Sequence, residues 1–143
     1  MTVAAILSVK GHDVVTTTAS ASVTQALSDL AKHGIGALVV VDGTGGIVGI
    51  VSERDLVRAL ASGGAEVLQG SIAAIMTRSV VTCSEADSIN ELMTLMTRGR
   101  FRHLPVVAKG RLAGIVSIGD VVKARIEQVE REAADLRSYI VTA

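Results

Sequence analysis

Two kinds of hydrophobic segment alternate along the chain. Short continuous apolar runs, such as residues 37–41 and 104–108, are flanked by glycine or polar residues, which is typical of strands buried on both faces. Longer segments, such as residues 22–32 and 88–97, carry apolar residues three and four positions apart, which indicates helices with one buried face. The pattern therefore predicts a protein of mixed helix and strand.

The predicted elements come in two copies with the same order: short helix, strand, helix, strand, strand, helix. The period is about 65 residues, which indicates an internal repeat. The first copy is predicted over residues 2–7, 14–17, 22–32, 37–41, 47–51 and 53–61. The second copy is predicted over residues 71–76, 80–83, 88–97, 104–108, 112–116 and from 118 onward. With residues 62–70 as the link, we expect one repeat over 1–66 and another over 67–143.

The clearest repeat is a stretch of nine residues at the end of a strand. Residues 49–57 (Gly-Ile-Val-Ser-Glu-Arg-Asp-Leu-Val) return as residues 114–122 (Gly-Ile-Val-Ser-Ile-Gly-Asp-Val-Val), with six of the nine positions identical. Each copy is predicted to lead from a buried strand into a helix, with the serine as N-cap. Free backbone N–H groups and the positive end of the helix dipole suit an anionic ligand at such a junction. Serine with aspartate three residues later also forms a helix capping box, which needs no ligand, and both interpretations can hold together.

Composition narrows the possible classes of protein. The chain is 49% hydrophobic, with Phe101 and Tyr139 as its aromatic residues, so its core is predicted to be aliphatic. Fourteen basic and fourteen acidic residues leave no net charge, which argues against a nucleic-acid partner. No apolar run is long enough to span a membrane, and the N-terminus lacks signal-peptide features. The single cysteine, Cys83, excludes an internal disulfide, so we expect a soluble cytoplasmic protein.

The order and duplication of these motifs resemble a tandem pair of cystathionine-β-synthase (CBS) domains, often called a Bateman module. The resemblance rests on the two Gly-Ile-Val-Ser-x-x-Asp segments, the strands Leu-Val-Val-Val-Asp and His-Leu-Pro-Val-Val, and the Val-Thr strand starts. It covers almost the whole chain. It implies an α/β (α+β) fold in which two βαββα-type repeats pack about a pseudo-twofold axis, with a long C-terminal helix. It also implies two clefts that commonly hold adenosine nucleotides.

The resemblance also assigns candidate site residues. Asp55 and Asp120 would bind ribose hydroxyls, while Ser52 and Ser117 would lie near phosphate. The backbone of the early strands would contact adenine, at Val15, Thr16, Thr17, Val81, Thr82 and Cys83. The chemistry agrees with this assignment, because a carboxylate can accept two hydrogen bonds from a ribose diol, and a serine hydroxyl with nearby backbone N–H groups can serve phosphate.

The two clefts are expected to differ. Arg102 and His103 precede the second Leu-Pro-Val strand, where family members often place basic residues that reach phosphate in the cleft of the other repeat. By that mapping they would face the cleft of Asp55, where Arg54 adds a further cation. The first copy has no arginine in the corresponding segment, and Gly119 replaces Arg54. We therefore expect AMP to bind more tightly beside Asp55; a solvated basic loop is the alternative interpretation of the arginines.

The last predicted helix carries a heptad pattern. Its apolar residues are spaced 4, 3, 4, 3 and 4 positions apart, with charged residues between them. These apolar residues are Val122, Ile126, Val129, Ala133, Leu136 and Ile140. The pattern favours a homodimer through the CBS faces and this helix, since family members usually pair as flat dimers. Ordinary amphipathic packing within one chain is the alternative.

We expect the chain to be a stand-alone regulatory module that senses adenine nucleotides and acts on an unknown protein. AMP is the first choice of ligand, followed by NAD(H), ADP and ATP, and no metal or catalytic cofactor is expected. A scaffold without ligand is one alternative. An enzyme is another, with Cys83 as nucleophile and His103 or His12 as base. Acidic neighbours of Cys83 should raise the pKa of its thiol, however, so we do not expect enzymatic activity.

Overall fold

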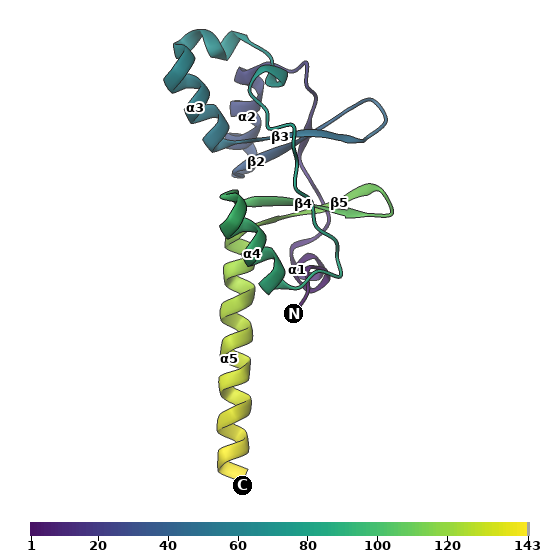
Figure 1. Cartoon of the computed structure of the whole chain (residues 1–143), viewed down its shortest axis with the longest axis vertical. Coiled ribbons are helices and arrows are strands. Elements are labelled where there is room, and N and C mark those ends of the chain that lie inside the picture. Colours follow the sequence, from purple (N-terminus) through teal and green to yellow (C-terminus); the bar gives the residue numbers. More distant parts are fainter. Residues whose placement is uncertain (143) are drawn as a thin grey trace. The chain divides into compact units, whose positions relative to one another are not determined.

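The elements in the computed structural model follow the duplicated order (Figure 1), and the structure describes residues 1–142. The first copy forms α1 (Val3–Lys10), β1 (Thr16–Thr17), α2 (Val23–His33), β2 (Ala37–Val41), β3 (Ile47–Ser52) and α3 (Glu53–Gly63). Two 3₁₀ helices follow, η1 (Gly64–Gln69) and η2 (Ile72–Ala74). The second copy continues with α4 (Ile89–Gly99), β4 (His103–Ala108), β5 (Arg111–Ser117) and α5 (Ile118–Thr142). The mixed fold with a long C-terminal helix is confirmed.

The chain divides into two compact units. The terminal unit, as we call it, contains Met1–His12, Thr82–Ala108 and the chain from Gly114 onward. The middle unit contains Asp13–Val81 and Lys109–Ala113. Each unit therefore joins the main part of one repeat to the short helical segment that begins the other repeat.

A three-stranded sheet forms the centre of the middle unit. Its order is β1-β2-β3, with β1 parallel and β3 antiparallel to β2. Ser22 caps α2 by accepting a hydrogen bond from the backbone N–H of Gln25 at 3.0 Å, and Gly34, with φ of 62°, ends the helix. The core is aliphatic, as expected, and consists of Val23, Ala26, Leu30, Leu38, Val40, Val51, Leu56, Ile72 and Met76.

The terminal unit repeats this plan around the β4–β5 hairpin. Ser88 caps α4 by accepting from the backbone N–H of Glu91 at 3.1 Å, which matches Ser22 in the first copy. Helices α1 and α4 pack against α5. Most buried side chains of this unit are again aliphatic, with Cys83 beside them: Val3, Ile6, Leu7, Ile89, Leu92, Met96, Leu104, Val106, Val116, Val121 and Ala124.

The short helix α1 is held in the terminal unit by backbone hydrogen bonds and by a close contact. Val3 N–H donates to the carbonyl of Asp87 at 2.9 Å. Leu7 is 1% exposed and lies over Gly114 of β5, where an added Cβ would come within 2.9 Å of a Leu7 methyl group. Glycine at 114 therefore allows the helix and the strand to approach closely.

The middle unit contains the equivalent arrangement. Ile72 N–H donates to the carbonyl of Ala21 at 2.8 Å. Met76 lies over Gly49 of β3, where an added Cβ would be 2.7 Å from the Met76 sulfur. Glycines 49 and 114 thus have the same function in the two repeats, which explains why both copies of the nine-residue stretch begin with glycine.

Both early strands are shorter than the sequence pattern predicts: β1 covers Thr16–Thr17 of the predicted residues 14–17, and the second copy has no regular strand. In the first copy, Val39 N–H donates to the carbonyl of Val15 at 3.4 Å. Pro105 occupies the position equivalent to Val39 and has no N–H to donate to Val81. Pairing is therefore limited to an isolated bridge at Cys83, whose N–H donates to the Pro105 carbonyl at 3.0 Å. The predicted strand over residues 80–83 was wrong in extent for this reason.

The helix predicted over residues 71–76 is also shorter, a single 3₁₀ turn over Ile72–Ala74. The chain leaves the helix early because Thr77 pairs with Ile50 of β3, with N–H to carbonyl distances of 2.9 Å in both directions. No helix within residues 1–142 is long and apolar enough to cross a bilayer.

Candidate ligand-binding site

The two strand-to-helix junctions share the two hydrogen bonds of a capping box. At the first junction, Ser52 N–H donates to Asp55 Oδ2 at 2.9 Å, and Asp55 N–H donates to Ser52 Oγ at 3.3 Å. At the second, Ser117 N–H donates to Asp120 Oδ2 at 2.9 Å, and Asp120 N–H donates to Ser117 Oγ at 3.2 Å. Both pairs are therefore capping boxes, and this interpretation of the motif is confirmed.

The capping bonds leave part of each carboxylate available. Asp55 and Asp120 are both half-buried, and each uses Oδ2 for its cap. Each Oδ1 can accept further hydrogen bonds from a diol, because an ionised carboxylate has about four acceptor sites. Capping and ligand binding are thus chemically compatible at both junctions. Ribose binding by the two aspartates stays a prediction.

Thr77 is a neighbour of Asp55 that the sequence did not reveal. Its hydroxyl donates to Asp55 Oδ1 at 3.4 Å. The backbone pairing of Thr77 with Ile50 brings it beside the junction, although it lies 22 positions away in the sequence. The duplication could have indicated this contact, because residues at or just after the end of each short helix pack beside a strand-to-helix junction. Spacing within the motif could not show this contact.

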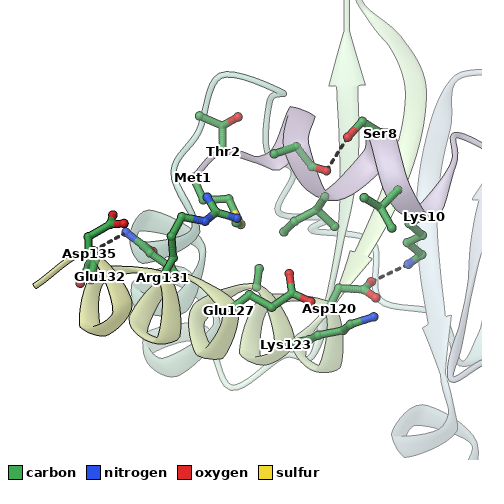
Figure 2. A pocket seen from close by; sticks show the side chains of 15 residues that line it. Met1, Thr2, Ser8, Lys10, Asp120, Lys123, Glu127, Arg131, Glu132 and Asp135 are labelled. Carbon is green, nitrogen blue, oxygen red and sulfur yellow. Dashed lines mark hydrogen bonds and ion pairs between the residues drawn. The ribbon is translucent and has the colours of Figure 1, made fainter. Parts of the chain in front are cut away.

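Lys10 is the corresponding neighbour of Asp120, and it is charged. At the end of α1, its ammonium group lies 2.6 Å from Asp120 Oδ2 (Figure 2). It also donates to the carbonyl of Ile115 at 2.8 Å. The second motif itself has no cation beside Asp120, because Gly119 occupies the position equivalent to Arg54. Lys10 comes instead from a segment 110 positions earlier in the chain.

The ion pair affects the titration of Asp120. Burial acts to raise the pKa of Asp120, but the hydrogen bonds from Lys10 and Ser117, together with the positive charge of Lys10, outweigh it. The pKa of this carboxyl is therefore lowered, and the group is a carboxylate at neutral pH. The side chains of Lys10 and Asp120 are 34% and 26% exposed, so water partly screens the attraction between them.

The early strands present backbone where adenine contacts were predicted. In the middle unit, β1 is the edge strand of the sheet, so one side of its backbone faces away from β2. Thr17 is 9% exposed and Thr16 is exposed. In the terminal unit, Cys83 pairs in the same parallel manner with Val106. Backbone reading of adenine by Val15–Thr17 and by residues 81–83 stays a prediction.

The basic residues lie at the starts of elements. Arg54 is exposed in the first turn of α3. Arg102 is exposed just before β4, and its carbonyl accepts from Ile118 N–H at 2.8 Å, which places its backbone beside the first turn of α5. The equivalent position of the first copy is a glycine. Because Arg102 and His103 belong to the terminal unit and Asp55 to the middle unit, their grouping in one cleft stays a prediction.

Cys83 has the properties of a core thiol. It is 6% exposed, and burial, assisted by the charge of Asp87, raises the pKa of its thiol to about 12. The expectation of a raised pKa is confirmed. A nucleophilic cysteine reacts as the thiolate, which such a pKa disfavours at neutral pH. Cys83 therefore lacks the main property that the enzyme hypothesis requires.

A groove runs between α1 and α5 in the terminal unit (Figure 2). It encloses about 860 Å³, and Lys10 and Asp120 lie in its wall. Ala5, Ile6 and Val9 supply apolar surface from α1. Of the candidate site residues, Asp120 alone lines this groove within residues 1–142. The side chain of Asp120 is thus accessible from a hollow, as a ligand-binding carboxylate must be.

Two copies of one α+β unit, each with a capped strand-to-helix junction, define a duplicated module. Residues 6–62 and 72–127 each match the family described as the CBS domain, and the chain belongs to that family as a tandem pair. The structure is similar to a CBS-domain-containing protein of Agrobacterium tumefaciens, with 51% identity and a TM-score of 0.86, over 87% of this chain and 99% of that one.

Two further relatives bear on the function. The CBS domain pair of protein MJ0100, in complex with 5′-methylthioadenosine and S-adenosyl-L-methionine, is 29% identical with a TM-score of 0.79, over 90% of this chain and 98% of that one. The mitochondrial CBS domain-containing protein CBSX3 of Arabidopsis thaliana is 34% identical over 83% of this chain. The matched region spans 60% of the length of CBSX3.

Proposed function

We propose that the chain is a regulatory module that binds adenine nucleotides in clefts between its two CBS repeats. AMP is the first ligand, followed by NAD(H), ADP and ATP. The main observation behind the proposal is the pair of matching capping boxes, in which the cap uses Oδ2 and leaves acceptor capacity on Oδ1 of Asp55 and Asp120. The MJ0100 pair, which binds two adenosine derivatives, supports an adenosine moiety as the common part of the ligand.

Within this proposal, phosphate binds more strongly near Asp55. Arg54 adds an exposed cation in the first turn of α3, and Arg102 and His103 are proposed to join it. Near Asp120, the charge of Lys10 is already neutralised by the carboxylate at 2.6 Å, so it adds little net attraction for phosphate. A ligand portion without phosphate suits that junction better. The asymmetry thus concerns the charge around the two aspartates, while their backbone geometry is the same.

The proposal includes assembly and location. Exposed apolar residues on the helix that follows each junction, Val57 on α3 and Ile118 on α5, support a homodimer through the CBS faces. Ligand binding would then change the shape or the association of the module. The cytoplasmic location expected from the sequence remains part of the proposal.

A thermal-shift screen of the full chain tests the ligand class. The compounds are AMP, ADP, ATP, NAD, 5′-methylthioadenosine and S-adenosyl-L-methionine. A ligand at 100 times its dissociation constant stabilises the fold by about 2.7 kcal/mol, which raises the melting temperature by several degrees. No shift with any compound would favour the ligand-free scaffold.

Calorimetric titration of AMP into Asp55→Asn and Asp120→Asn tests the site. Asparagine keeps an oxygen that can accept the capping hydrogen bond but removes the charge. We expect AMP affinity to fall at least about tenfold in Asp55→Asn, because hydrogen bonds to a charged group are lost. A smaller loss is expected in Asp120→Asn, and none in the control Asp29→Asn on α2. Equal losses at both junctions would refute the asymmetry.

A further inference from the structure

Helix α5 has two different faces. Val121 and Ala124 are 1% and 5% exposed and pack within the terminal unit. The predicted heptad residues lie on another face and stay accessible. Their exposed fractions are 46% for Val122, 53% for Ile126, 46% for Val129, 60% for Leu136 and 65% for Ile140. The heptad seam, as we call residues 122, 126, 129, 133, 136 and 140, is thus not used by the helix's own unit.

The second half of α5 buries no side chain within the structure described. Every residue from 129 to 142 is exposed, and the helix runs on past α1 and α4 to its yellow end in Figure 1. Isolated helices of this length are marginally stable in water, and helical stability in proteins comes mainly from packing of an apolar face. The heptad seam therefore indicates a helical partner.

The charges beside the seam indicate which partner fits. In the heptad, Val122, Val129 and Leu136 occupy d positions, and Ile126, Ala133 and Ile140 occupy a positions. Arg125 and Glu132 then occupy g positions, while Glu130 and Arg137 occupy e positions. In a parallel pair, each g residue faces the e residue five positions later in the other helix. Arg125 would face Glu130 and Glu132 would face Arg137, so a second copy is complementary at all these positions.

We propose that residues 122–140 of α5 pair in register with the same segment of a second copy, as a parallel two-stranded coiled coil. Isoleucine at a positions 126 and 140 with leucine at d position 136 favours this arrangement, while valine at d positions 122 and 129 favours it less. The proposal deepens the homodimer of the proposed function, since it gives the helix its own interface and register. It does not depend on any bound ligand.

Disulfide trapping of the full chain tests the register. In a parallel in-register pair, position 136 faces position 136 of the second copy, and cysteines can bridge Cα–Cα distances of about 4.4–6.8 Å. We expect Leu136→Cys to become a covalent dimer on mild oxidation. Ser138→Cys, on the far side of the helix from the seam, should not. The unmodified chain is the second control, because its own Cys83 is buried.

Charge reversal tests the pairing of e and g residues. Arg125→Glu would face Glu130 twice in the symmetric pair, and like charges repel. We expect this variant to dimerise about tenfold more weakly by sedimentation, and to cross-link less in the Leu136→Cys background. Adding Glu130→Arg should restore dimerisation. No recovery in the double variant would contradict the proposed pairing.

The other possible results distinguish the coiled coil of α5 from a dimer through the CBS faces and from ligand binding. A chain that is dimeric in solution but does not cross-link at position 136 would overturn the coiled coil and leave a dimer through the CBS faces. Cross-linking only when Ile126→Cys and Leu136→Cys are combined would indicate antiparallel helices and overturn the parallel register. A monomeric chain would overturn both dimer proposals. None of these outcomes changes the thermal-shift test of ligand binding.

Discussion

Lys10 and Asp120 join the N-terminal helix to the second capping box through one ion pair. Asp120 accepts from Ser117 and from Lys10 with the same oxygen, so the cap and the ion pair are coupled. Its lowered pKa reflects both contacts. A group whose pKa is lower in the folded than in the unfolded state stabilises the fold above its unfolded pKa, about 3.9 for aspartate. That stabilisation is lost as pH falls through the folded pKa.

We therefore predict a pH-dependent difference between the unmodified chain and Asp120→Asn. At pH 7 the unmodified chain should be more stable by up to about 1 kcal/mol, because partly exposed ion pairs contribute no more than that. The difference should disappear as pH is lowered from about 4 through the lowered pKa. Urea unfolding at a series of pH values measures it, with Lys10→Met as the matched variant that keeps the cap. A difference that is independent of pH would contradict the linkage.

At the scale of residues, the sequence showed the members of each motif but not their neighbours. Ser52 with Asp55 could be recognised as a capping box because the contact is local. The contacts of Thr77 and Lys10 with the two aspartates could not be recognised, because they depend on how the folded chain brings these residues to the junctions. The missing information was tertiary, since no spacing rule connects residues 10 and 120.

At the scale of elements, Pro105 explains the largest departure from the predicted pattern. Residues 14–17 and 80–83 are both rich in β-branched residues and differ in type only at the last position, so both were predicted as strands. The second lacks the hydrogen bond that Val39 donates to Val15 in the first copy. The cause was visible in the sequence, but its effect depends on the neighbouring strand, which is not adjacent in the chain.

We predict that Pro105→Val extends the second early strand. Valine supplies an N–H at the position equivalent to Val39, whose N–H donates to the Val15 carbonyl, and it suits the buried site of Pro105 in size. The new amide should exchange slowly with solvent in a hydrogen-exchange experiment read by NMR, as we also expect for the hydrogen-bonded amide of Val39. The free energy of unfolding should change by less than about 1 kcal/mol, because the added hydrogen bond offsets the lost rigidity of proline. Rapid exchange at position 105 would show that the proline is not the cause.

At the scale of the whole molecule, the exchange of short helices is the main feature that the repeat pattern did not show. The sequence marks two copies in order, and it places α1 with the first and η2 with the second. The structure packs α1 with the second copy and η2 with the first. Both arrangements satisfy the same hydrophobic pattern, because Leu7 and Met76 have similar volumes and face equivalent glycines. Only the three-dimensional contacts distinguish them.

This exchange predicts which unit each substitution weakens. Leu7→Ala removes a buried side chain and should cost about 2–5 kcal/mol. Amides of α4 and β4, in the second repeat, should then exchange faster than those of α2 and β2. Met76→Ala should have the opposite pattern, with faster exchange in the first repeat. Equal changes in both units would show that they open together as one cooperative structure.

The same exchange sets an order in which the two units can be completed during synthesis. Most of the middle unit is one continuous stretch, Asp13–Val81, which can begin to fold while the residues after it are still being synthesised. Residues 1–12 leave the ribosome before any of the middle unit. Val3 and Leu7 cannot make their contacts, however, until Asp87 and Gly114 have also been synthesised. Helix α1 thus finds its place only after the main part of the second repeat has been synthesised.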